Sequence, residues 1–327
     1  MDSGDTAFVL ISAAMVMFMI PGLALFYGGM VRAKNVLATV MQSFFTMGLV
    51  SVLWVLAAYS LAFSPGNRFI GGLSWIGFSG VGQEPNPDLS ATVPHIAYAV
   101  FQLFFAAITP ALITGAFAER MKFSAFALFT TLWLFLVYAP LAHWVWAPGG
   151  WLRELGALDF AGGTVVHMNS GFAALAAGIV CAFAVGLKYK AGYDDALDVV
   201  GVHAVGGMLG ALLIGVFAST AFNEAGADGL LAGGGLTLLG KQAVAVVATL
   251  AFSFVVSFGL LKLVDLVVGL RVTEEDELAG LDISQHEEVG YAFAEGVGSA
   301  APVPAGAAAA AERSAPSTVR VPQGDLG

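Results

Sequence analysis

The chain has 327 residues, of which 58% are hydrophobic and 11% are charged, and its formal net charge is −10. A soluble domain carries about 25% charged residues, so this composition excludes a soluble globular protein of this length. Ten Asp or Glu residues against three Lys or Arg follow Leu270, so the acidity is typical of a solvated tail rather than of a binding face for a basic partner.

Seven stretches with little or no charge predict membrane-spanning helices. About 20 apolar residues in a helix span a bilayer, and helix is expected because lipid cannot satisfy an exposed backbone. The predicted spans are 7–30, 36–63, 95–119, 123–147, 163–187, 198–221 and 240–270. The sequence therefore predicts an all-α, polytopic protein that passes several times through a cell membrane.

The loop charges predict the orientation of the chain. Loops that follow the odd-numbered spans hold six basic residues and the other loops hold three, which places the N-terminus outside and the C-terminus in the cytoplasm. We expect a transmembrane domain at 1–270 and a cytoplasmic segment at 271–295 that could fold against it. An Ala/Pro-rich composition predicts that the tail, 296–327, is disordered.

Two histidines inside apolar spans are the leading functional candidates, because polar groups within a membrane are costly and often functional. A lone histidine there is often only packed or hydrogen-bonded. His167 and His203, however, lie in similar contexts, each with a glycine four residues later, in spans of opposite predicted direction. Such a pattern suggests an inverted repeat with a site near the midplane. Neutral imidazoles, each with one donor and one acceptor, could pass a proton or bind a small neutral amine.

A few further side chains could assist a cation. Phe101 and Phe105 lie on one helix face, and Trp146 ends the following span; aromatic faces stabilise a cation by roughly 0.5–2 kcal/mol each. Packing against lipid is the plainer interpretation of these rings. Asp159 could cap the helix of His167 or attract cations, and Asp198 precedes His203 in a comparable way.

The sequence offers little support for other classes of function. We find no nucleophile, cofactor or metal signature that outranks packing, so we expect neither an enzyme nor a metal site, and no nucleic-acid partner. The span count and Lys262 in the last span leave a light-driven pump or receptor as a weaker alternative. Spans one to five contain no mid-helix carboxylate that could serve as the counter-ion of a buried Schiff base.

Together these motifs resemble the ammonium transporter family, the Amt/Mep/Rh proteins. The stretches that carry the resemblance are 21–29 (PGLALFYGG), 115–120 (GAFAER), 158–167 (LDFAGGTVVH), 198–203 (DVVGVH) and, in the tail, 269–272 (GLRV) and 280–282 (GLD). The resemblance implies transport of ammonium or ammonia in nitrogen uptake, through one pore in each subunit of a homotrimer. It also implies a possible PII-type signal protein as a partner at the cytoplasmic face.

The resemblance further implies a role for each candidate residue. His167 and His203 match the twin pore histidines, and Phe101 and Trp146 match the outer aromatics that recruit the cation. Phe105 matches one ring of a stacked phenylalanine gate. Asp159 matches the acidic residue that supports the outer site.

The chain departs from the family pattern in the number of its spans. The family has eleven spans and about seven are found here. Span 163–187 begins like family helix five and ends like family helix nine, so three helices between them are expected to be absent. The leading hypothesis is ammonium transport through a histidine-lined pore; the alternative is a truncated inactive or regulatory, ammonium-sensing member of the family.

Overall fold

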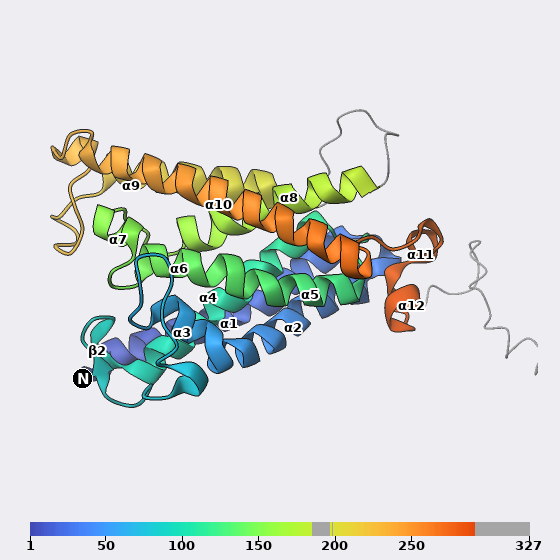
Figure 1. Cartoon of the computed structure of the whole chain (residues 1–327), viewed down its shortest axis with the longest axis horizontal. Helices are drawn as coiled ribbons and strands as arrows, with labels where there is room; N and C mark the ends of the chain where they lie inside the picture. Colours follow the sequence, from blue (N-terminus) through green and yellow to red (C-terminus); the bar gives the residue numbers. More distant parts are fainter. Residues whose placement is uncertain (185–196, 198, 292–327) are drawn as a thin grey trace, which may run out of the picture. The chain divides into compact units, whose positions relative to one another are not determined.

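Long apolar helices, aligned along one axis, make up most of the structure, which is a computed structural model (Figure 1). It describes residues 1–184, 197 and 199–291, with side chains of 180–184 excepted. The α-helices of eight or more residues are α1 (Ser3–Met30), α2 (Val36–Leu53), α4 (His95–Ile113), α5 (Phe123–Trp133), α6 (Ala139–Trp146), α8 (Asn169–Ala184), α9 (Gly206–Phe217) and α10 (Thr237–Val268).

Shorter elements connect or extend these helices. The short α-helices are α3 (Tyr59–Phe63), α7 (Trp151–Leu155), α11 (Glu274–Ala279) and α12 (Leu281–His286). The short π-helical segments are η2 (Trp54–Ala58), η5 (Leu134–Tyr138), η6 (Gly163–Met168) and η7 (Val200–Val205). The 3₁₀ turns are η1 (Ala33–Asn35), η3 (Ile76–Phe78), η4 (Thr114–Ala116) and η8 (Leu230–Ala232).

The helical membrane fold predicted from composition is confirmed. Within the described residues, six continuous helical stretches are long and apolar enough to cross a membrane: Ser3–Met30, Ala33–Phe63, His95–Ala116, Phe123–Leu155, Val200–Phe217 and Thr237–Val268. Segment η6 continues into α8 within the predicted span 163–187, whose end lies outside the described residues. The count of seven spans and their sidedness therefore stay predictions.

The two ends of the bundle differ in structure. The N-terminus lies at one end, beside a small hairpin, and α11 and α12 lie at the other (Figure 1). The hairpin pairs β1 (Pro85–Asn86) with β2 (Ser90–Pro94) in antiparallel fashion. These strands were not expected from the sequence, because a loop of mixed polarity between two spans carries no alternating pattern.

The hydrophobic core lies between α2–α3, α4, α5–α6 and the neighbouring faces of α1, α8 and α10. Among its fully buried side chains are Trp54, Trp133 and Tyr138. The indoles also satisfy their N–H groups, since Trp54 Nε1 donates to the Ala99 carbonyl at 3.1 Å and Trp133 Nε1 donates to Ser257 Oγ at 2.8 Å. Hydrogen-bonded aromatic groups of this kind hold the helices in one register inside lipid.

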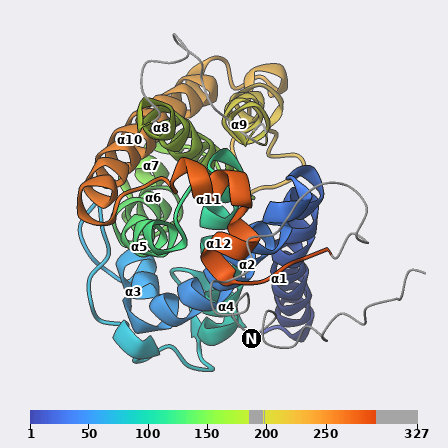
Figure 2. The ribbon, with the colours of Figure 1, turned by 90° about the vertical axis from the view of Figure 1, so that its right-hand side faces the viewer.

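The chain after α10 folds back over the end of the bundle. Figure 2 shows α11 and α12 lying across this end, with the long helices around them. Asp282, 2% exposed, accepts hydrogen bonds from the Leu37 and Ala38 N–H groups at 3.1 and 2.8 Å. Its carboxylate therefore caps the N-terminus of α2, where a negative charge is favoured. Residues up to Tyr291 belong to one unit with the helices; 292–327, including the tail predicted to be disordered, lie outside the described residues.

Candidate functional site

Both candidate histidines lie in π-helical segments. His167 is in η6, which leads into α8, and His203 is in η7, which leads into α9. Gly162 precedes η6 with φ +89°, a left-handed conformation that glycine adopts without a steric penalty. Isolated π-helical turns occur often at functional sites, because the wider turn redirects a side chain. The sequence alone did not predict these turns.

The two histidine segments cross closely because each contributes a glycine to the contact. A methyl group added to Gly171 would collide with the backbone of Ala204, the residue after His203. One added to Gly207 would lie 2.8 Å from the Gly163 carbonyl oxygen and 3.0 Å from Met168 Cγ, and Met168 follows His167. The glycine four residues after each histidine thus packs near the other histidine. This reciprocal contact supplies a structural reason for the repeat seen in the sequence.

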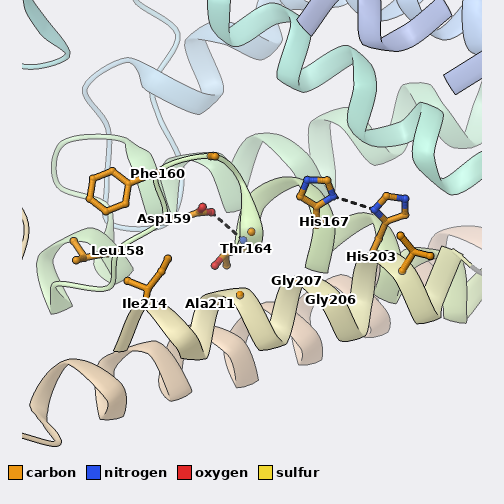
Figure 3. Close-up of a pocket in the computed structure, with 14 residues that line it drawn as sticks. Leu158, Asp159, Phe160, Thr164, His167, His203, Gly206, Gly207, Ala211 and Ile214 are labelled. Atoms are coloured by element: carbon orange, nitrogen blue, oxygen red, sulfur yellow. Dashed lines mark hydrogen bonds between the residues drawn. The ribbon is translucent and has the colours of Figure 1, made fainter. Parts of the chain in front are cut away.

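The crossing brings the two imidazoles into direct contact. His167 Nδ1 lies 3.0 Å from His203 Nδ1, and the ring planes differ by only 10°. Figure 3 shows the two rings pointing toward one another above α9. A hydrogen bond between two nitrogens needs one donor and one acceptor. One Nδ1 therefore carries a hydrogen and the other does not, so the two rings cannot both be doubly protonated in this arrangement.

Two cavities meet at the histidine pair. The first, of about 640 Å³, is lined by residues between Leu158 and Ile214, including Asp159. The second, of about 360 Å³, lies beside α1 and α4 and includes Phe105 in its lining. Both are lined mainly by apolar side chains, and His167 and His203 line each of them. A small molecule that moved from one cavity to the other would pass the imidazoles.

Asp159 acts on the backbone at the start of η6. Its Oδ1 accepts from the Gly162 N–H at 2.8 Å, and its Oδ2 accepts from the Thr164 and Val165 N–H groups at 3.0 Å each. Burial raises the pKa of Asp159, whereas these backbone N–H donors act in the opposite direction. Of the two roles left open by the sequence, this geometry is that of the helix cap. The carboxylate thereby orients the segment that carries His167.

The three candidate aromatic rings form a connected row. Phe101 and Phe105 meet edge to face with centroids 5.0 Å apart, and Phe105 meets Trp146 at 6.1 Å. Trp146 Nε1 donates to the Asp159 carbonyl at 2.8 Å, so the row is tied to the cap of η6. Phe105 lines the second cavity, whereas Phe101 and Trp146 line neither cavity.

Sequence reasoning missed part of the cavity lining. Gly22 and Phe26 of α1 line the second cavity; their motif was quoted for its resemblance, without a role. The signal was weak, because apolar residues that line a cavity look like apolar residues that face lipid.

Other polar side chains of the helices lie away from the histidine pair. His95 and His143 are buried, at 4% and 1% exposure. His95 Nε2 bonds to the Tyr59 hydroxyl at 2.6 Å, and His143 contacts backbone carbonyls through both ring nitrogens. Lys262 is exposed, above the Phe258 ring, which does not suit a buried Schiff base. Asp198 lies outside the described residues.

Comparison with known proteins decides the family. The sequence model of the Ammonium Transporter Family matches residues 7–177 and 175–291, which is most of the chain. The chain belongs to the ammonium transporter family. The expectation from the sequence motifs is thus confirmed, and the family match together with the long apolar helices shows a multi-pass membrane protein.

Individual members of the ammonium transporter family are similar to it along nearly their whole length. An ammonium transporter of Bacillus subtilis is 40% identical over 403 residues, covering 89% of this chain and 99% of that protein. The ammonium transporter Amt1 of Archaeoglobus fulgidus is 33% identical over 404 residues, covering 89% of this chain and all of that protein. The crystal structure of Mep2 from Candida albicans has a TM-score of 0.73 at 25% identity, covering 84% of this chain and 87% of that chain.

The family match is interrupted within α8, the helix that follows the segment carrying His167. Its two matched ranges meet at residues 175–177, inside α8. The alignment with the Bacillus subtilis transporter is also longer than the 327 residues of this chain. A family member that lacks an internal stretch gives both features, and the predicted fusion in span 163–187 contains this point.

Proposed function

We propose that this protein transports ammonium or ammonia across the membrane along a path lined by His167 and His203. The observation that carries the proposal is the 3.0 Å contact between the two Nδ1 atoms at the place where two apolar cavities meet. Family membership supports the substrate, since relatives that match along most of this chain are named ammonium transporters.

The proposed path begins at the aromatic row. Phe101 and Trp146 recruit the ammonium ion, because aromatic faces stabilise a cation that has lost part of its water. Phe105 controls entry into the cavity beside the histidines, which it lines. Within the cavity, the imidazole pair offers the polar groups that a small amine needs in apolar surroundings. Asp159 contributes by holding the start of η6 through its three hydrogen bonds.

Uptake of radiolabelled methylammonium by cells that lack other ammonium carriers tests the proposal. Cells that express the protein should take up methylammonium faster than cells with an empty vector, and His203→Ala should reduce the uptake to about one-tenth or less, because it removes one of two polar groups lining both cavities. Gly201→Ala, in the same segment η7 but with nothing within 4 Å and outside the lining of both cavities, is the matched control. Uptake at the vector level by an inserted, folded protein would contradict the proposal.

An inactive or regulatory, ammonium-sensing role is the second candidate, and one observation favours it. The flank of η7 and α9 is exposed at Val202 and Leu209, by 62% and 57%, beside the interruption of the family match. A path open on one side to lipid could bind ammonium without conducting it. Specific binding of ammonium to purified protein, together with uptake at the vector level, would establish this role. Sequencing the gene around codon 176 tests whether the interruption is genuine.

We also propose an oligomeric state and a protein partner, both from the family resemblance. The family resemblance supports a homotrimer, and the broad exposed apolar surface of α1 and α9 is compatible with contact between subunits. The resemblance also supports binding of a PII-type protein at the cytoplasmic end, which we assign to the end with α11 and α12. Mass measurement in detergent tests the trimer, and co-purification with a PII protein tests the partner.

A further inference from the structure

One buried amide on α10 bonds to two stretches of chain that adjoin the segments carrying the histidines. The Gln242 side chain is 1% exposed. Its Oε1 accepts a hydrogen bond from the Leu158 N–H at 2.7 Å, and its Nε2 donates to the Leu158 carbonyl and to the Ala211 carbonyl, each at 2.9 Å. The amide oxygen and both amide hydrogens are therefore used, and all three bonds go to backbone groups of other elements.

Each partner of Gln242 is close in the chain to one histidine segment. Leu158 immediately precedes Asp159, whose carboxylate accepts three N–H groups at the start of η6. Ala211 lies on α9, eight residues after His203. The two hydrogen bonds between Gln242 and Leu158 fix the orientation of the amide as well as its distance from the Leu158 backbone. The amide therefore holds the chain beside Asp159, which caps η6, next to α9.

A second side chain of α10 supports the same connection. Ser253 donates to the Asn169 carbonyl at 2.7 Å, two residues after His167. The contact of Ser257 with Trp133 Nε1 at 2.8 Å has a different destination, because α5 carries no candidate pore residue. α10 therefore supplies both an anchor for the histidine segments and, on the same helix, a buried hydrogen bond that serves as a comparison.

We propose that Gln242 is a positioning residue that sets the placement of η6 relative to η7 at which the two Nδ1 atoms meet. Gln242 contacts neither imidazole; it acts through Leu158 and Ala211. Its effect on transport rests on the proposed function, whereas its effect on the histidine contact does not. Glutamine suits the task because its side chain offers one acceptor and two donors without a charge, and a charge would be costly at a buried site in a membrane.

The test compares Gln242→Leu and Gln242→Glu with Ser257→Ala in the full-length protein, reconstituted in lipid bilayers. Nitrogen-15 NMR of histidine-labelled protein detects coupling across the hydrogen bond between His167 and His203. We expect coupling in the wild type and in Ser257→Ala, and its loss in Gln242→Leu. Gln242→Glu has nearly the same shape but cannot make both donations, so it should also weaken the coupling. Methylammonium uptake should fall on the order of tenfold with the coupling.

The outcomes separate this inference from the proposed function. Wild-type coupling retained in a folded Gln242→Leu or Gln242→Glu protein overturns the inference, as does the absence of coupling in the wild type. If both variants fail to fold while Ser257→Ala folds, Gln242 determines the whole bundle and the positioning role is also overturned. If the wild type shows no uptake, transport is contradicted, and the NMR comparison still decides the role of Gln242.

Discussion

The two histidine segments have similar sequences but very different surroundings. Val166, directly before His167, is 3% exposed, whereas Val202, directly before His203, is 62% exposed. Two residues after the histidines, Asn169 is 0% and Val205 is 54% exposed. Both segments contact α8, α9 and each other, and the first is further enclosed by α4, α6 and α10.

The enclosure of each histidine segment therefore depends on the helices that pack against it rather than on its own sequence. The reciprocal glycine contacts let the two segments cross closely enough for the imidazoles to meet. Walling the pair off from lipid requires further helices, and the family match is interrupted at 175–177, between the two segments in the chain. The histidine contact is therefore formed, whereas the path beside it is incompletely enclosed.

Breaking the crossing should have the largest effect. Gly207→Ala places a methyl group against the Gly163 carbonyl and Met168, so the segments must move apart and the histidine contact is lost. Methylammonium uptake should then fall on the order of tenfold or more. Gly201→Ala, at a residue of η7 that has nothing within 4 Å and lines neither cavity, should retain uptake. Equal uptake by the two variants would show that the close crossing is unimportant.

The cap of the enclosed segment should give the next largest effect. Asp159→Ala leaves three N–H groups without their acceptor, which should destabilise the fold by about 1–3 kcal/mol. Asp159→Asn keeps one acceptor oxygen and should cost less. Thermal unfolding in detergent measures both; an Asn variant as unstable as the Ala variant would argue that charge, rather than hydrogen bonding, is what matters.

Truncating the matched valines tests the comparison at its most direct point. Val166→Ala removes two methyl groups from a packed site and should destabilise the fold by about 1–3 kcal/mol. Val202→Ala, at the exposed counterpart, should change stability by less than about 0.5 kcal/mol. If Val202→Ala proves as costly as Val166→Ala, a partner that covers the flank of η7 is present in the membrane.

The smallest expected effect is a pH dependence at the end that carries α12. Burial lowers the pKa of His286 from its ordinary value of 6.5, and Asp282 acts in the opposite direction. The His286 ring meets Phe123 edge to face, with centroids 5.1 Å apart. Because the pKa of His286 is lowered on folding, its stabilising contribution to the folded state is complete above pH 6.5 and is lost as the pH falls below that value. Protease protection of α12 should weaken below pH 6.5 in the wild type and not in His286→Gln. Identical pH profiles would rule out His286 as the cause.

The helical membrane fold and the two histidines could be predicted because lipid imposes strong rules on sequence. Apolar length predicted the spans, and the cost of polar groups in lipid singled out His167 and His203. The glycine that follows each histidine was visible as a pattern, but its reciprocal contact required the three-dimensional crossing. The role of Asp159 stayed open because a cap and a cation site use the same residue type.

The features that sequence did not predict depend on contacts between distant elements. Gln242 resembles any polar residue near a helix end until its bonds to Leu158 and Ala211 are seen. The π-helical turns at η6 and η7 leave no composition signal. The burial of His95 and His143 follows from carbonyls and a hydroxyl supplied by other elements, which span prediction does not include.

The most direct test of the account is methylammonium flux into liposomes that contain only the purified protein. We predict flux above that of empty liposomes in the wild type, and its loss in His167→Ala and in His203→Ala while Gly201→Ala retains it. Flux in the wild type that both histidine variants preserve would contradict the central role of the His167–His203 contact. No flux from a folded wild-type protein would contradict transport itself.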